Sequence, residues 1–327
     1  MCTLIVLHRC VPGRPLVVAA NRDEFFDRPA EGVALRSSAT GPIVSPLDLE
    51  AGGTWVGLSA RRVFVGLTNL RPVSADEAEE TTEYSQDSEK LLVRAAAAPR
   101  AKRSRGDVVM MALEAESAAK AVDAVLDLEA GAFNPFQLLV ADGKEAWLVV
   151  YRGEARAIAL EPGPHIVGNV VDEQVEARLG ASSLHPLETV RSEPRLRKLT
   201  RIRERVEKLM TEPGRDLFEG LAGICREHVG SFRSHADGMD SREQNGRLLT
   251  TPEGGDQVDS PFESTCVHDA HRYGTRSSLL LELCENDDAH RLWTTNGPPC
   301  EQPYENRSFL LRELGILPGD QTGTETT

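Results

Sequence analysis

The sequence predicts an α+β protein built as a four-layer αββα sandwich. Short apolar runs typical of β-strands open the chain, return in its middle and return again near its end, and two pairs of helical patterns separate these groups. This block order indicates two mainly antiparallel sheets flanked by helical layers. We expect a single domain over residues 1–315 and a disordered tail over residues 316–327.

The first group of strands spans the first seventy residues. Strands are predicted over 3–7 and 16–20, and the Pro- and Gly-containing segment 11–15 joins them as a hairpin. Two further strands are predicted over 54–59 and 63–68. We therefore expect the chain to begin as a β-meander.

The rest of the chain carries both helical and strand patterns. An acidic stretch without apolar periodicity over 71–89 indicates a solvated loop. The helices expected from apolar residues at helical spacing are 86–98, 107–128, 194–211 and 214–229. Apolar runs predict strands over 136–141, 146–151, 155–160 and 165–168, which we expect to form a second sheet. Two more strands are predicted near the end of the chain, over 276–284 and 289–295. Residues 230–264 are expected to form a long excursion.

Composition excludes several classes of function. The formal net charge is −14, so the cationic surface that nucleic acid requires is not provided and we expect no nucleic-acid partner. No run of about 18 apolar residues occurs, so we expect no stable membrane insertion. The N-terminus lacks the basic region and the long apolar stretch of a signal peptide, and the six scattered cysteines favour a reduced, cytoplasmic setting.

Position 2 carries the first chemical signal. After removal of Met1, which a small residue at position 2 permits, the chain begins with a thiol beside a free amine. An α-amino group titrates at about 7.7–8.0, so it can take the thiol proton without a histidine. Cys2 is therefore a candidate nucleophile with its own base, and its alternative interpretation is an ordinary small residue at the start of a strand.

A charged cluster follows the second predicted strand. Arg22, Asp23 and Glu24 come directly after its apolar run. If this strand pairs with the first, the cluster lies next to residue 2, where Arg22 lowers the thiol pKa and a carboxylate holds the amine. A charged turn is the alternative interpretation.

Polar residues also mark other strand ends. Asn69 and Asn169 each close an apolar strand with an uncharged amide, which can donate a hydrogen bond to a developing oxyanion. Arg276 opens an apolar strand. It serves either as a salt-bridge partner or as a contact to the substrate or the nucleophile. Trp55 follows a glycine pair and either walls a substrate pocket or packs in the core.

A metal centre is not expected. Cys266, His268 and His271 lie close in sequence, but two of them alternate on an extended segment and the sequence indicates no fourth ligand. The chain also has no haem attachment motif. We therefore expect no metal and no cofactor.

Five segments resemble the NRDE family, which includes the transport and Golgi organisation protein 2 of animals and many bacterial members. They are Met1–Thr3, Asn21–Glu24, Gly52–Gly57, Leu67–Asn69 and Tyr273–Ser278. The resemblance spans about residues 1–310, and the NRDE and GGTW blocks in that order are highly specific. The family is itself similar to cysteine N-terminal-nucleophile (Ntn) hydrolases of the choloylglycine hydrolase and penicillin V acylase type, whose fold is the αββα sandwich.

The resemblance implies that six polar residues form one catalytic site: Cys2, Arg22, Asp23, Asn69, Asn169 and Arg276. It implies a nucleophile and base at position 2, an oxyanion hole formed by the two asparagines with backbone N–H groups, and charged residues that tune the thiol. In the acylase group two residues separate the Arg from the Asp, whereas Arg22 and Asp23 are adjacent and point to opposite faces of a regular strand. Either a bulge brings both inward, or Glu24 takes the carboxylate role.

Two functions follow from these residues and from the resemblance. The first is a cysteine Ntn amidohydrolase that cleaves a non-peptide C–N bond, an N-acyl amide, through an acyl-enzyme. The second is a carrier that binds a hydrophobic ligand, such as haem or acyl-CoA, without turnover. The sequence does not separate them, because residues that polarise a carbonyl also bind carboxylates.

Overall fold

The computed structural model describes residues 2–70, 102–180, 186–229, 261–269, 272–286 and 289–316, with only the backbone for 186–192, 261 and 269. The predicted loop 71–89, the predicted helix 86–98 and nearly all of the predicted excursion 230–264 lie outside these ranges. Residues 317–327 of the predicted tail also lie outside them.

One antiparallel sheet joins the beginning of the chain to its end. Its strand order is β10-β1-β2-β12-β13-β14, with β11 paired to β12. The strands are β1 (Cys2–Val11), β2 (Arg14–Phe25), β10 (Gly163–Val167), β11 (His268–Asp269), β12 (Tyr273–Leu283), β13 (Arg291–Asn296) and β14 (Glu305–Asn306). Since β1 and β2 pair as the predicted hairpin, residues 2 and 22 lie directly opposite each other.

The second antiparallel sheet follows chain order from β3 to β9. Its strands are β3 (Ala30–Ser38), β4 (Gly41–Asp48), β5 (Val56–Ser59), β6 (Phe64–Asn69), β7 (Phe136–Ala141), β8 (Ala146–Tyr151) and β9 (Ala155–Leu160). The predicted meander is thus divided between two sheets, and the strands predicted over 136–160 continue the sheet begun by β3. The edge strand β3 was not predicted because most of its residues are partly or fully exposed, so it lacks an apolar run.

Helices cover both outer faces, and the last helix packs against the core between the sheets. They are α1 (Arg105–Leu113), α2 (Ala118–Leu126), α3 (Glu173–Leu179), α4 (Pro186–Thr211), α5 (Leu217–Cys225) and α6 (Phe309–Leu314), with a short 3-10 turn η3 (Pro261–Glu263). The prediction of one helix over 107–128 was wrong, because Ser117 accepts a hydrogen bond from the Lys120 N–H and so caps a second helix.

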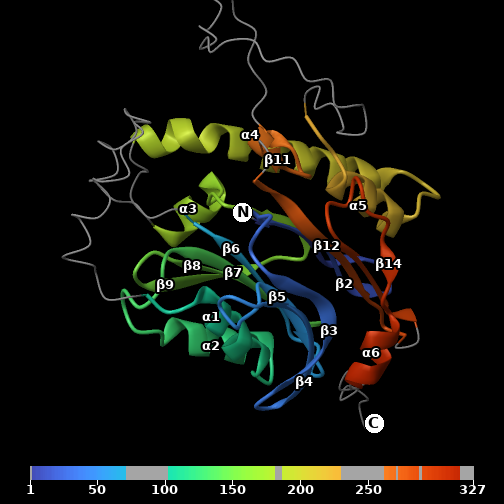
Figure 1. The fold of residues 1–327 in the computed structure, drawn as a ribbon, viewed down its shortest axis with the longest axis horizontal. Helices are drawn as coiled ribbons and strands as arrows, with labels where there is room; N and C mark the ends of the chain where they lie inside the picture. Colours follow the sequence, from blue (N-terminus) through green and yellow to red (C-terminus); the bar gives the residue numbers. More distant parts are fainter. Residues whose placement is uncertain are drawn as a thin grey trace, which may run out of the picture.

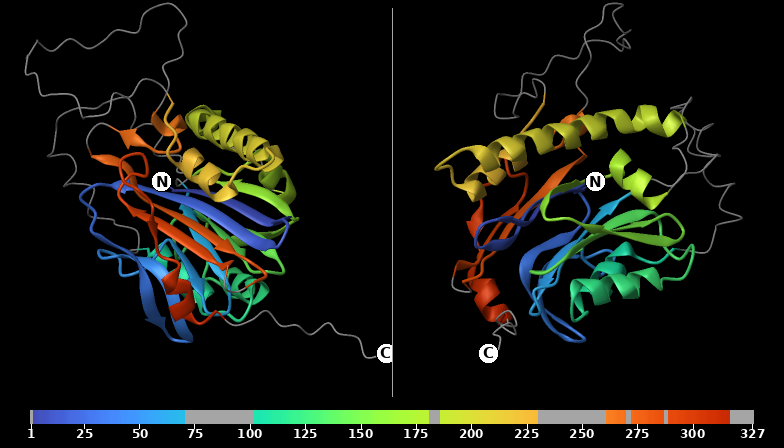
Figure 2. Two further views of the ribbon diagram at one scale, coloured as in Figure 1. Left: turned by 90° about the vertical axis from the view of Figure 1, so that its right-hand side faces the viewer. Right: turned by 180° about the vertical axis from the view of Figure 1, so that it is seen from behind.

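The layers stack as αββα, which confirms the predicted fold class (Figure 1). Figure 2 shows α4 and α5 on one outer side and α1 and α2 on the other, with both sheets between them. Successive side chains of β1 alternate between two layers. Leu4 and Val6 pack between the sheets, whereas Ile5 and Leu7 pack beneath α4 and α5.

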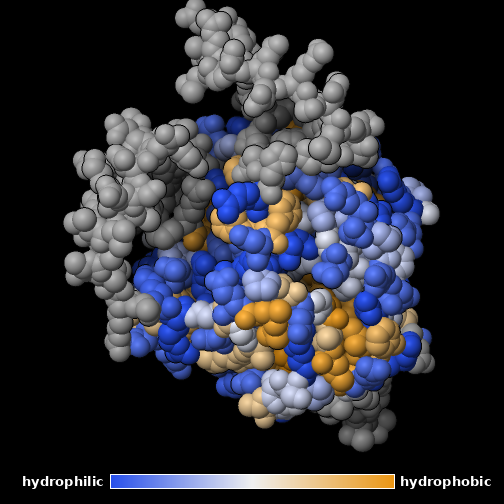
Figure 3. Space-filling model, in the orientation of Figure 1, coloured by the Kyte–Doolittle hydropathy of each residue, from blue (hydrophilic) through white to orange (hydrophobic). Residues whose placement is uncertain are grey.

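The face drawn in Figure 3 is largely hydrophilic, with apolar residues gathered toward β3 and α6. Leu35 on β3 and Phe309 on α6 are among the exposed large apolar side chains. Within the part of the chain that the structure describes, no helix combines the length and the apolar character of a membrane span.

Candidate active site

Cys2 opens β1 at the edge of a cavity. Leu4 and Val6 of this strand point between the sheets, and the Cys2 residue is only 7% exposed. The cavity has a volume of about 340 Å³ and is lined by Cys2, Arg22, Trp55 and Asn69 among others. Asp23 and Glu24 line it as well. The fold therefore brings six of the predicted site residues to one cavity, from β1, β2, the segment before β5, and β6.

Asn169 holds the start of β1 in place. The backbone N–H of Cys2 donates to Asn169 Oδ1 at 3.0 Å, and Asn169 Nδ2 donates to the backbone carbonyl of Asn69 at 2.7 Å. The side-chain amide therefore ties the nucleophile's nitrogen to the end of β6. Asn69 differs, because it lines the cavity and, among the described residues, no hydrogen bond of its side chain is recorded.

Arg22 lies on the same face as Cys2 and is the centre of an ion-pair cluster. Its guanidinium is 3.0 Å from Asp48 Oδ2 on β4 and 3.7 Å from Glu24 Oε2. Arg28 approaches the same Asp48 oxygen at 2.7 Å. Burial raises the pKa of Asp48, but hydrogen bonds from Arg28 and from the Ala51 N–H outweigh it and hold that pKa below its ordinary value. The cluster thus links the two sheets beside the thiol.

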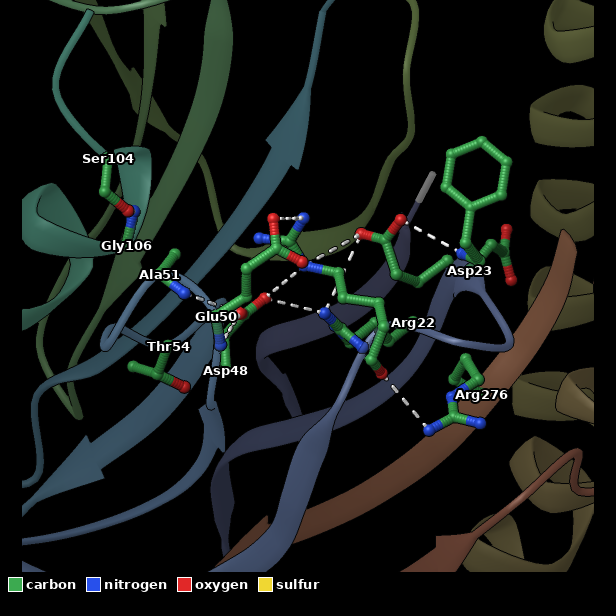
Figure 4. Close-up of polar contacts among 12 residues, drawn as sticks. Arg22, Asp23, Asp48, Glu50, Ala51, Thr54, Ser104, Gly106 and Arg276 are labelled. Atoms are coloured by element: carbon green, nitrogen blue, oxygen red, sulfur yellow. Dashed lines mark hydrogen bonds and ion pairs between the residues drawn. The ribbon is translucent and has the colours of Figure 1, made fainter.

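Asp23 points the other way, toward α4, as Figure 4 shows. Its carboxylate accepts a hydrogen bond from the Thr275 hydroxyl at 2.6 Å and lies 3.8 Å from Lys198 Nζ on α4. Both charged groups are buried. Adjacent residues of β2 thus keep opposite faces, and Glu24 lies on the side of Arg22. Both carboxylates line the cavity, and both raise the pKa of Cys2.

Arg276 stands at a bulge in β12. The pairing of β12 with β2 shifts register between Thr275 and Ser277, which leaves Arg276 without a cross-strand partner. Its guanidinium donates to the backbone carbonyls of Phe26 at 2.8 Å and Arg28 at 3.4 Å. It lines a separate small cavity of about 30 Å³, which shares Arg22 and Trp55 with the larger one. Arg276 therefore supports the turn after β2.

The electrostatics of the thiol combine opposing effects. Burial raises the pKa of Cys2, the N-terminal ammonium and Arg22 lower it, and Asp23 and Glu24 raise it. The net pKa lies above the ordinary thiol value. The thiol is therefore protonated at neutral pH, and a nucleophilic Cys2 needs a base to remove its proton.

Three basic residues line one part of the cavity. Lys102, Arg103 and Arg105 line it at the start of α1, and none has a carboxylate partner recorded among the described residues. Instead, Arg105 donates to the carbonyl of Pro135 at 3.2 Å, and Arg103 stacks on Phe133. The helix N-terminus adds to the positive potential. A ligand with a negative group fits these residues, although the whole chain carries a formal net charge of −14.

The glycine pair before Trp55 serves a close approach between chain segments. A Cβ at Gly53 would lie 2.8 Å from backbone atoms of Gly106 at the start of α1. This contact requires glycine at positions 53 and 106. Both glycines line the cavity, beside its basic residues.

Sequence reasoning missed several residues around the site: Arg28, Asp48, Arg105 and Lys198. Asp48 and Arg105 belong to a sheet and a helix whose positions relative to β1 depend on the tertiary fold. Arg28 follows the NRDE block closely, and its position four residues after Glu24 is the signal that could have identified it.

The fold and the site define an αββα protein whose first strand carries a cysteine beside an inter-sheet cavity. Residues 1–292 match the family described as Transport and Golgi organisation 2, so the chain belongs to that family. It is 30% identical over 167 residues to the Transport and Golgi organization protein 2 homolog of Bos taurus, and equally so to homologs of Mus musculus and Homo sapiens. The match covers 48% of this chain, and the chain spans about half the length (51%) of these relatives.

The solved structures that this chain matches include two hydrolases. One is the Caenorhabditis elegans ortholog of N-acylethanolamine-hydrolyzing acid amidase, with 13% identity, coverage of 68% of this chain and 84% of that chain, and a TM-score of 0.42. The other is a mutant conjugated bile acid hydrolase from Clostridium perfringens, with 9% identity, coverage of 94% and 93%, and a TM-score of 0.46.

Proposed function

We propose that this protein is an N-terminal-cysteine amidohydrolase that cleaves a non-peptide C–N bond. The observation that carries the proposal is the arrangement of Cys2, whose residue lines the cavity while its backbone nitrogen is held by Asn169 Oδ1 at 3.0 Å. When Met1 is removed, the same nitrogen becomes an amine. One of its protons keeps the bond to Asn169, and its lone pair is free to accept the thiol proton.

The reaction proceeds in two halves. The amine takes the proton from Cys2 Sγ, and the thiolate attacks the amide carbon to form a tetrahedral intermediate whose oxyanion Asn69 stabilises from the cavity wall. The C–N bond then breaks, and the ammonium of Cys2 protonates the leaving amine. Water, deprotonated by the same amine, attacks the thioester and releases the acid and the free thiol. One amide and one water therefore give one acid and one amine.

The basic residues of the cavity select among amides. Lys102, Arg103 and Arg105 favour a substrate with a carboxylate or phosphate away from the scissile bond. A cavity of about 340 Å³ lies in the range of small-molecule sites, so a compact acyl or amine portion fits inside it.

Intact-mass spectrometry tests this function. The processed protein, beginning at Cys2, is exposed to N-acyl amides that differ in chain length and in the charge of the amine portion. We expect at least one of them to add the mass of an acyl group to the protein, and peptide mapping to locate that group on Cys2. Cys2→Ala is the control and should remain unmodified; acylation of both proteins, or of neither across the panel, would contradict the proposal.

The second candidate function is binding without turnover. The same three cations favour it, because they can bind an anionic headgroup and this binding does not involve the thiol of Cys2. This function predicts that haem or an acyl-CoA binds Cys2→Ala as tightly as the unmodified protein, and that affinity depends on Trp55 and Arg105. Equilibrium titration of both ligands against these variants distinguishes it from hydrolysis.

A further inference from the structure

Four side chains outside the candidate active site form a compact group of metal-binding atoms. His228, Cys266, His268 and Cys300 each offer one ligand atom, and these atoms all lie within 4.8 Å of one another. They come from the segment after α5, the segment before β12 and the loop after β13. In the sequence only Cys266, His268 and His271 lie close together, and we expected no metal there. His271 lies outside the described residues, and the fold brings His228 and Cys300 to the group.

The three distances recorded among Cys266, His268 and Cys300 are close to those around a tetrahedral ion. Cys266 Sγ is 3.5 Å from Cys300 Sγ and 3.6 Å from His268 Nε2, and His268 Nε2 is 3.2 Å from Cys300 Sγ. With Zn–N bonds of about 2.0 Å and Zn–S bonds of about 2.3 Å, ligands at tetrahedral angles lie about 3.3–3.8 Å apart. The two sulfurs are also too far apart for a disulfide, whose S–S length is about 2.05 Å.

The surroundings support a closed, structural site. The second ring nitrogen of His268, Nδ1, lies 3.9 Å from the Glu301 carboxylate, on the side where a carboxylate often supports a metal-bound histidine. The segments are also held together by backbone bonds, because the Cys266 N–H donates to the Glu227 carbonyl at 2.9 Å. Two Cys and two His ligands with tetrahedral spacing select Zn²⁺ among the common divalent ions.

We propose that His228, Cys266, His268 and Cys300 bind one structural Zn²⁺ ion that joins α5, β12 and the loop after β13. This inference is independent of the proposed hydrolase function. It has a consequence for the NRDE segment, because Val267 lies between two ligands and exchanges two hydrogen bonds with Thr275, both 2.8 Å. Thr275 in turn holds the Asp23 carboxylate. The ion therefore stabilises the segment that positions Asp23.

Metal analysis of the untagged, reduced full-length chain tests the proposal. We expect about one zinc per chain by elemental analysis after dialysis against ZnCl₂, and the visible absorption of a tetrahedral Co²⁺–thiolate complex when Co²⁺ replaces it. Two ligands near the surface allow variants that spare the buried Cys266: His228→Ala and Cys300→Ser should each weaken zinc binding at least tenfold. Cys10→Ser, a thiol change outside the group, is the matched control and should bind like the parent.

Thermal unfolding adds a second measurement. A chelator should lower the Tm of the parent and of Cys10→Ser, and it should leave the Tm of Cys300→Ser unchanged. The proposal is overturned if the reduced parent retains no zinc, if Cys300→Ser binds zinc as tightly as the parent, or if mass spectrometry finds a Cys266–Cys300 disulfide in place of the metal.

Discussion

Asn69 and Asn169, which look equivalent in the sequence, have different contacts. Asn169 uses both ends of its amide, toward the Cys2 nitrogen and the Asn69 carbonyl, whereas Asn69 lines the cavity. Asn169 is therefore a positioning residue for the N-terminus, and Asn69 is the better candidate for the oxyanion donor.

This difference predicts different outcomes for the two alanine variants. Asn69→Ala should lower kcat by about 10²–10³, as loss of one oxyanion donor does, with little change in Tm. Asn169→Ala should lower kcat as well, but it also removes two partly buried hydrogen bonds and should destabilise the protein by about 1–3 kcal/mol. Kinetics and denaturant unfolding of both variants check this; equal stability losses would show that the assignment of the two roles is wrong.

Arg22 lowers the pKa of Cys2, against the larger effect of burial. Arg22→Gln should therefore raise that pKa further and slow alkylation of Cys2 at neutral pH. Arg28→Gln is the matched control, because Arg28 shares the Asp48 carboxylate but is not among the groups that shift the thiol. Mass-resolved alkylation rates, with Cys10 as an internal standard, measure the effect; equal rates in parent and Arg22→Gln would assign Arg22 to structure alone.

Arg105 tests the preference for an anionic ligand. It lines the cavity, and burial lowers its pKa, yet the pKa of a guanidinium is high enough that it stays charged at neutral pH. Arg105→Gln should raise KM for an amide with a carboxylate and leave KM for its neutral analogue unchanged. Steady-state kinetics on a matched pair of amides measure this, and a parallel change in both would reject a charge-based role.

At the scale of residues, the sequence predicted the members of the site better than their contacts. Cys2 and Arg22 follow from the hairpin, because antiparallel pairing sets them opposite each other. The faces of β2 on which Asp23 and Glu24 lie could not be predicted from the sequence. They depend on whether β2 stays regular at the place where β12 has a bulge. Asp48 was not predictable, because its position depends on how β4 packs across from β2.

At the scale of elements, the loop before β5 and the start of α1 depend on each other. Gly53 and Gly106 bring their backbones into direct contact, and both line the cavity. The GGTW block could be predicted as a site of close approach, but its partner could not, because residue 106 belongs to a helix more than fifty residues away. Apolar periodicity likewise predicted α1 and α2 as one segment without revealing the cap at Ser117.

Gly53→Ala should destabilise the protein by about 1–3 kcal/mol, because the new Cβ would lie 2.8 Å from the backbone of Gly106 and force α1 away. Gly32→Ala is the matched control, since a Cβ there meets nothing within 4 Å and the backbone needs no positive φ. Denaturant unfolding of both variants checks the expectation. Equal midpoints would show that α1 can shift without cost.

At the scale of the whole molecule, the sequence predicted four layers but not how the strands divide between them. Local patterns identify strands, whereas membership of a sheet depends on which edges meet after collapse. The return of β10 to pair with β1 is an example, since it places Asn169 beside residue 2 from 167 positions away. The site thus exists only when both sheets have formed around the first strand.

In the proposed mechanism, the free amine of Cys2 is the catalytic base. The most direct measurement compares amide hydrolysis by protein processed to Cys2 with hydrolysis by protein that keeps one residue before it, both verified by intact mass and by equal Tm. We expect turnover only in the processed form, because an amide nitrogen cannot accept the thiol proton. Full activity in the protein that still carries Met1 would contradict it.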